Sequence, residues 1–155
     1  MDQLYLAPKR TRRGTRAKGN EKHSPDKLKI YFNNINGYTS KQGCLNQITK
    51  SISPDVIALC ETKVSAKSNP KLNGYEPIVS NCKTGKEGFL VAIKEGTFMN
   101  AEKISESKEK NIVTVQVVYP ECTMRFIVAH GPQENDEIDA KNEFYESLMV
   151  EIERG

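Results

Sequence analysis

Long hydrophobic runs are absent from this sequence of 155 residues. The longest apolar stretch near the core signals covers residues 56–60, whereas a membrane-spanning helix needs roughly 20. The first residues also lack the apolar centre of a secretory signal. We therefore expect a soluble protein, nuclear or cytoplasmic and not secreted, that has no membrane as a partner.

Closely spaced cysteine pairs are absent as well. The four cysteines, Cys44, Cys60, Cys82 and Cys122, form no C-x-x-C pair. Structural zinc sites use closely spaced ligand pairs, so this spacing argues against zinc. Without a secretory signal a disulfide framework is not expected either. We expect reduced cysteines, with Cys60 as a small apolar core residue.

Acidic residues are scarce at the start of the chain. Residues 1–29 hold nine lysines and arginines against three acidic residues, a net charge of +6, whereas the remainder carries −3. Little in this segment can be buried, so residues 1–27 are predicted to be a disordered basic tail. Its Lys9-Arg10-x-Arg12-Arg13 cluster either attracts nucleic-acid phosphates or serves nuclear import, or it is a solvated tail without a specific role.

Residues 28–60 have a β-α-β pattern. Residues 28–32 alternate like a strand, and residues 33–37 have the composition of a turn. Leu45, Ile48 and Ile52 then recur at helical spacing before Ser53-Pro54 ends the helix. Residues 55–60 form a nearly continuous apolar run, which is typical of a strand buried on both faces.

The rest of the chain mixes strands with one helix. Residues 61–87 are mostly loop with a short strand near residues 76–80, followed by strand-like runs at 88–94, 112–119 and 124–130. The last two are joined as a hairpin. A helix begins near Asp136, with Asp136 or Asp139 at its N-terminus and one apolar face comprising Ile138, Asn142, Tyr145, Leu148, Met149 and Ile152. This order predicts an α/β or α+β fold with mixed sheets over residues 28–155.

Two polar residues follow the strands of the β-α-β unit. Because a right-handed crossover makes these strands parallel, Asn34 and Glu61 should lie at the same edge of the sheet. From its position alone, Glu61 is either a surface loop residue or a metal ligand. Mg²⁺ suits such an edge, because it needs only one or two carboxylates and completes its octahedron with water and substrate phosphate.

A histidine ends another predicted strand. His130 follows Phe126-Ile127-Val128-Ala129 and precedes a Gly-Pro turn. At that position an imidazole can reach a cleft and act as a general acid or a donor to phosphate. The alternative is a partly exposed loop histidine.

Three blocks of sequence together resemble the endonuclease/exonuclease/phosphatase superfamily. They are Asn34-Ile35-Asn36-Gly37, the run Pro54-Asp55-Val56-Ile57-Ala58-Leu59-Cys60-Glu61-Thr62-Lys63, and Ala129-His130-Gly131-Pro132-Gln133-Glu134. The first two are similar to blocks of apurinic endonucleases and LINE-type nucleases, and the third looks most like the retrotransposon branch. The resemblance implies the N-terminal half of a four-layer α/β sandwich and hydrolysis of DNA phosphodiesters with Mg²⁺ or Mn²⁺.

The resemblance also implies roles for individual residues. Glu61 would ligate the metal, with Asn34 ordering the metal site, and His130 would be catalytic where this branch often carries tyrosine. The residues that would contact substrate are Asn36, Lys63 and Gln133.

Two family blocks are missing from the sequence. The G-D-x-N block would supply the aspartate that orients the attacking water, and a later block would supply an Asp-His pair. We therefore expect the isolated chain to cleave DNA poorly, and a non-catalytic nucleic-acid-binding module that uses the basic tail is the alternative. An incomplete sandwich should also expose sheet edges, which predicts marginal stability, self-association or a completing chain.

Overall fold

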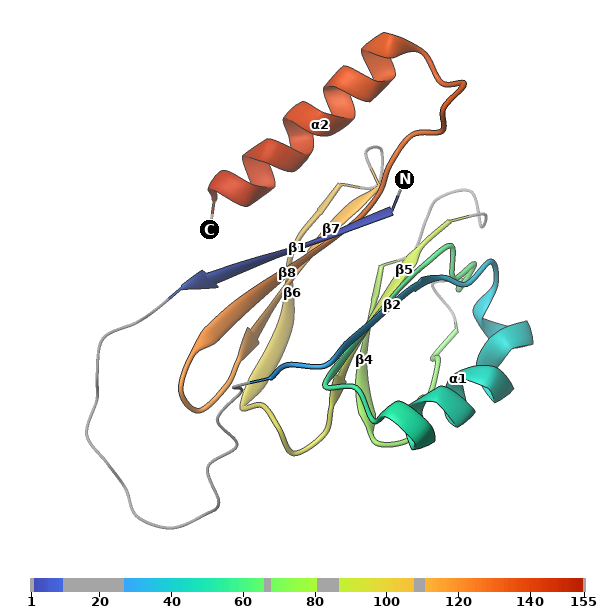
Figure 1. Cartoon of the computed structure of the whole chain (residues 1–155), viewed down its shortest axis with the longest axis vertical. Coiled ribbons are helices and arrows are strands. Elements are labelled where there is room, and N and C mark those ends of the chain that lie inside the picture. Colours follow the sequence, from blue (N-terminus) through green and yellow to red (C-terminus); the bar gives the residue numbers. More distant parts are fainter. Residues whose placement is uncertain (1, 10–26, 66–67, 81–86, 108–110, 155) are drawn as a thin grey trace.

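The computed structural model describes residues 2–9, 27–65, 68–80, 87–107 and 111–154. Two helices and eight strands alternate along the chain (Figure 1). In order they are β1 (Asp2–Lys9), β2 (Ile30–Asn34), α1 (Tyr38–Ile52), β3 (Val56–Cys60), β4 (Tyr75–Ser80), β5 (Phe89–Lys94), β6 (Asn100–Ser107), β7 (Ile112–Val118), β8 (Thr123–His130) and α2 (Ile138–Glu153).

The strands form two four-stranded sheets. One has the order β1-β8-β7-β6 and the other the order β2-β3-β5-β4. β2 and β3 pair in parallel, as the β-α-β pattern predicts, whereas every other pairing in the two sheets is antiparallel. The predicted hairpin of β7 and β8 is confirmed, and its turn is closed by Tyr119 N–H, which donates to Cys122 O at 2.8 Å.

The two sheets face each other across an apolar core. Alternate residues of each strand point to opposite faces, so Val56, Ala58 and Cys60 of β3 meet Phe126 and Val128 of β8 between the sheets. All five residues of β3 are buried, which confirms the prediction of a strand buried on both faces. The core lies directly beneath the ends of β3 and β8 that carry Glu61 and His130.

Each helix covers the outer face of one sheet. Leu45 of α1 packs with Ile57 and Leu59 of β3, while Phe144 and Leu148 of α2 pack against the outer face of β7 and β8. The resulting order of layers is α1, sheet, sheet, α2, with the helices on opposite sides of the molecule (Figure 1). The predicted α/β fold with mixed sheets in an incomplete four-layer sandwich is confirmed.

The predicted buried face of α2 is wrong. Ile138, Tyr145 and Met149 are exposed, by 74%, 45% and 53%, and the helix is anchored instead by Phe144 and Leu148. Apolar residues occur on both sides of this helix, so helical periodicity alone cannot identify the side that meets the sheet.

The N-terminus of α2 also differs from the prediction. The residue that precedes the helix is Glu137, which makes no side-chain capping hydrogen bond, and Asp139 lies in the first turn. The Asp136 carboxylate instead accepts a hydrogen bond from Gln133 N–H at 2.6 Å. Asp136 therefore stabilises the turn before the helix rather than the helix end.

The prediction of a disordered tail over residues 1–27 is wrong for its first part. Residues 2–9 form β1, which pairs antiparallel with β8 from residue 2 opposite His130 to residue 9 opposite Thr123. The backbone supplies this pairing, so it does not need the apolar content that the segment lacks. Residues 10–26 lie outside the described residues. β6 is a second strand that the sequence did not indicate.

No helix in the described part of the chain is long and apolar enough to cross a membrane.

Truncating the core should unfold a measurable share of the protein's stability. Phe126 is fully buried between the sheets, so Phe126→Ala should lower the free energy of unfolding by about 3–5 kcal/mol. Met99 is 72% exposed, and Met99→Ala should stay within about 0.5 kcal/mol of the parent. Denaturant titration followed by circular dichroism measures both. Equal losses in the two variants would contradict this packing.

Candidate active site

The loops after β2 and β3 are held together by backbone hydrogen bonds. Ile35 N–H donates to Cys60 O at 3.0 Å, Gly37 N–H to Glu61 O at 2.8 Å and Tyr38 N–H to the next carbonyl, that of residue 62, at 2.8 Å. These bonds continue the parallel pairing of β2 and β3 beyond the ends of the strands. They place residues 34–37 beside residues 61–63 at the carboxyl edge of the sheet.

Several residues of these loops have a left-handed backbone. Asn36, Glu61 and Lys63 have φ values of 46°, 52° and 53°, and Gly37 has a φ of 106°. A residue other than glycine costs about 1–3 kcal/mol in this region, and such conformations concentrate at functional sites. Gly37 explains the glycine of the Asn-x-Asn-Gly block, because only glycine adopts this φ without strain.

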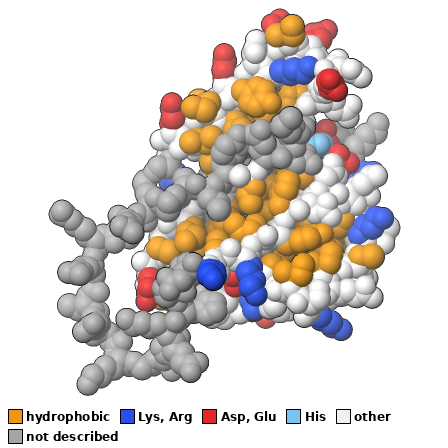
Figure 2. All heavy atoms as spheres, in the orientation of Figure 1, with side chains coloured by type: hydrophobic (Ala, Val, Ile, Leu, Met, Phe, Trp, Pro, Cys, Tyr) orange, Lys and Arg blue, Asp and Glu red, His pale blue; other side chains and the backbone are white. Residues whose placement is uncertain are grey.

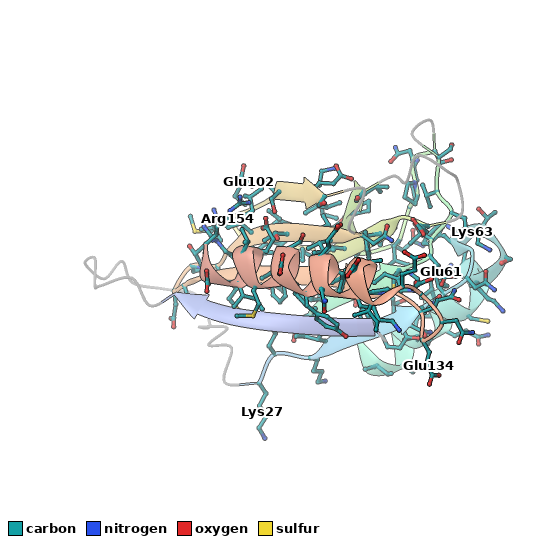
Figure 3. The ribbon with its side chains drawn as sticks, turned by 90° about the horizontal axis from the view of Figure 1, so that it is seen from above. Lys27, Glu61, Lys63, Glu102, Glu134 and Arg154 are labelled. Carbon is teal, nitrogen blue, oxygen red and sulfur yellow. The ribbon has the colours of Figure 1, made fainter. Side chains whose placement is uncertain are left out.

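Five of the six predicted site residues are connected in one series of contacts. Lys63 Nζ donates to Asn36 Oδ1, and Asn36 N–H donates to Asn34 Oδ1 at 3.3 Å. Asn34 Nδ2 donates to Glu61 Oε1 at 2.8 Å, and His130 Nε2 lies 3.4 Å from the same oxygen. Glu61 and Lys63 lie at the same end of the molecule (Figure 3). The two sheets therefore meet at Glu61, because His130 belongs to β8 and Asn34 to β2.

The sixth residue, Gln133, is not part of this series. Its side chain is exposed, and its backbone N–H is used in the turn that contains Asp136. No described contact joins Gln133 to Glu61 or Lys63, so its predicted role in substrate binding stays a prediction.

His130 borders a cavity that the sequence did not indicate. The cavity has a volume of about 210 Å³, and its lining includes His130, Asn111, Asp136, Glu143 and Phe144. Asn111 also fixes the strand end, since its carbonyl accepts a hydrogen bond from His130 N–H at 2.9 Å. The signal for Asn111 was its residue type: asparagine is favoured in the left-handed region, and Asn111 has a φ of 51°.

Two buried groups support the site from below. Thr62 is 1% exposed, and its Oγ1 has no hydrogen-bond partner among the described residues. Tyr38 OH donates to Lys71 O at 2.9 Å, and burial raises the pKa of the Tyr38 phenol, which keeps it neutral. A neutral Tyr38 adds no negative charge beside Glu61.

The residues present fit a magnesium site with one carboxylate. In the part of the chain that the structure describes, no three histidines, cysteines or acidic residues cluster as a metal cage. Both contacts to Glu61 use Oε1, and Oε2 accepts no hydrogen bond within the described residues. One carboxylate oxygen beside an amide suits Mg²⁺, which retains water and binds substrate phosphate, and does not suit zinc.

Comparison with known proteins adds the fold. No family model matches the sequence, and no curated protein matches it significantly. In structure the chain is similar to the AP endonuclease LMAP from Leishmania major, with a TM-score of 0.64 and 17% identity over 81% of this chain and 47% of that one. The fold is of the AP endonuclease type. The catalytic domain of APE2 from Xenopus laevis is also similar, with a TM-score of 0.57 and 20% identity over 78% of this chain and 52% of that one.

The chain spans about half the length of these two AP endonuclease structures. At these identities the likeness establishes the fold alone. The incomplete sandwich described above agrees with this coverage, because the aligned part includes most of this chain but only half of each neighbour.

The left-handed backbone at Lys63 predicts a conflict between stability and binding. Lys63→Gly removes an exposed side chain and relieves the backbone, so the free energy of unfolding should rise by up to about 1 kcal/mol. Lys71 is an exposed loop lysine without a positive φ, and Lys71→Gly should lower stability slightly. Thermal denaturation of both variants checks the sign. Destabilisation of Lys63→Gly to the level of Lys71→Gly would show that the backbone at residue 63 is not strained.

Proposed function

We propose that this chain is a magnesium-dependent, DNA-binding nuclease-like domain that cleaves poorly on its own. The connected series from Lys63 to His130 at the carboxyl edge of the sheet carries this proposal. The AP endonuclease-type fold supports it, since both structural neighbours are named as AP endonucleases or their catalytic domain. Assignment to a LINE-type retrotransposon rests on the Gly-Pro-Gln-Glu block at residues 131–134.

The residues divide the work of holding a phosphodiester. Glu61 and Asn34 would hold Mg²⁺ (or Mn²⁺), which when bound supplies a Lewis acid for a phosphate oxygen. Lys63 presents an ammonium group to the same phosphate, and Asn36 positions it. His130, in contact with Glu61, donates a hydrogen bond to a phosphate oxygen when its imidazole carries the proton.

The proposal includes weak catalysis because these residues bind the phosphate better than they activate water. The 155 residues contain no G-D-x-N sequence to orient a nucleophile, and Glu61 is committed to the ion. General-base catalysis and charge stabilisation each contribute orders of magnitude to rate, so their loss leaves binding with little cleavage. A retained family fold with a site limited to binding is the function that this geometry favours.

Magnesium-dependent DNA binding tests the site. In fluorescence anisotropy with a short duplex that carries an abasic-site analogue, Mg²⁺ should tighten binding by roughly tenfold over EDTA. Glu61→Gln should abolish this gain, because the neutral amide cannot ligate Mg²⁺ as a carboxylate does. Glu134→Gln, at an exposed glutamate of the nearby turn, is the matched control and should retain it. An equal response to Mg²⁺ in Glu61→Gln would reject the site.

Cleavage is tested with the same proteins. The isolated chain at near-stoichiometric concentration should leave a supercoiled plasmid and the abasic duplex intact in Mg²⁺ or Mn²⁺. Nicking that disappears in Glu61→Gln would show that the chain is a competent nuclease and would overturn the proposal of weak catalysis.

The alternative is a binding module that relies on the basic tail, and substitution separates it from the site. Deletion of residues 1–27 would also remove β1, so Arg10, Arg12 and Arg13 should be replaced by glutamine instead. If the site binds DNA, the salt dependence should weaken by about one unit of slope per lost phosphate contact while the response to Mg²⁺ persists. Loss of both would favour the tail as the binding element.

A further inference from the structure

β2 lies at the edge of its sheet with half of its backbone groups directed outward. Lys29 C=O accepts hydrogen bonds from the 55–56 segment, and Ile35 N–H donates to β3. Backbone groups alternate between the two sides of a strand, so residues 30, 32 and 34 direct N–H and C=O away from β3. Among the described strands none pairs with this side of β2. A strand with matching groups can therefore add here.

The side chains of β2 are those of an interior strand. Leu28, Ile30 and Phe32 pack on the core between the sheets, and Tyr31 packs on the core beneath α1. Strands that are apolar on both faces are usually covered on both edges as well. Figure 2 shows hydrophobic side chains gathered on both sides of the strip that β2 occupies on this face of the molecule.

The edges on the opposite side of the sandwich carry protection that β2 lacks. β4 contains Pro77, and β6 presents exposed Glu102 and Lys103 with an irregular register between Lys103 and Ser105. Proline, charge and bulges are the features that prevent pairing at natural sheet edges. The sequence of β2, Ile-Tyr-Phe-Asn-Asn, contains none of them.

A groove beside β2 offers room for the side chains of an added strand. It has a volume of about 340 Å³ and lies between β2 and α1, where Tyr31, Asn33 and Ile35 face Leu45 and Ile48. Apolar residues line its floor and polar residues its rim. This composition fits a strand with mixed apolar and polar side chains.

We propose that a second copy of this chain pairs its β2 antiparallel to this β2 about a two-fold axis at Phe32. In this register residue 32 faces its own copy and residue 30 faces residue 34, so all outward donors and acceptors meet partners. Exposed Lys27 and Lys29 of one copy then lie beside the Asn34–Glu61 end of the other.

Charge complementarity selects this register and orientation. Antiparallel pairing places the basic start of β2 opposite Gly37, whose N–H binds Glu61 O, whereas a parallel register would place the lysines of both copies together. Lys27 points away from both sheets (Figure 3) and can reach across. The dimer would therefore give each candidate site a lysine from its partner.

Hydrogen exchange of the full chain tests the pairing without DNA or Mg²⁺. Sedimentation should show a dimer that dissociates on dilution, and the amides of Ile30 and Phe32 should exchange roughly 100-fold more slowly in the dimer than in the dilute monomer. The amides of Tyr31 and Asn33 face β3 and serve as internal controls, slow at both concentrations. A monomer at all concentrations, or a dimer with fast exchange at Ile30 and Phe32, would overturn the proposal.

A charge reversal tests the register. Lys27→Glu should raise the dissociation constant of the dimer about tenfold at low salt, because it replaces attraction to Glu61 with repulsion. Lys71→Glu, at an exposed lysine outside β2, should leave it unchanged. An unchanged constant in Lys27→Glu would overturn the antiparallel register. These results are independent of the proposed nuclease-like function, since a monomer could still bind DNA through Glu61.

Discussion

The backbone hydrogen bonds that join the loops after β2 and β3 determine where every group of the candidate site lies. A parallel strand pair would normally diverge at its ends, but three bonds, from residues 35, 37 and 38, extend the pairing by several residues. They require left-handed backbone at Asn36 and Glu61, and so they hold a carboxylate against an amide from the neighbouring strand. The buried β3 beneath makes this arrangement rigid, because a strand packed on both faces cannot shift alone.

The sequence was informative where side-chain burial follows a simple period. The β-α-β unit, the β7–β8 hairpin and the buried β3 were all predicted, since each buries a regular apolar pattern. β6 has mostly exposed side chains and is held by pairing with β7, so its own pattern carried no signal. β1 was missed for a similar reason, because its partner β8 lies at the far end of the sequence.

The predicted site residues illustrate what a sequence can and cannot specify. Strand ends placed Asn34, Glu61 and His130 on one edge, and the structure brings all three to a single carboxylate oxygen. The contact between Lys63 and Asn36 could not be derived in this way, because it depends on left-handed backbone at both residues. Backbone conformation of this kind is set by long-range hydrogen bonds and leaves no periodic trace.

The pairing of β1 with β8 has a consequence for synthesis on the ribosome. β1 is made first, but its partner residues 123–130 are made only after almost the whole domain has left the ribosome. At about 5–20 residues per second the first strand waits on the order of ten seconds for its place in the sheet. Closing so long a loop also costs entropy, which makes this pairing one of the last steps of folding. During that interval the β8 edge is open to strands of other newly made chains, and a chaperone that binds extended segments would find its target there.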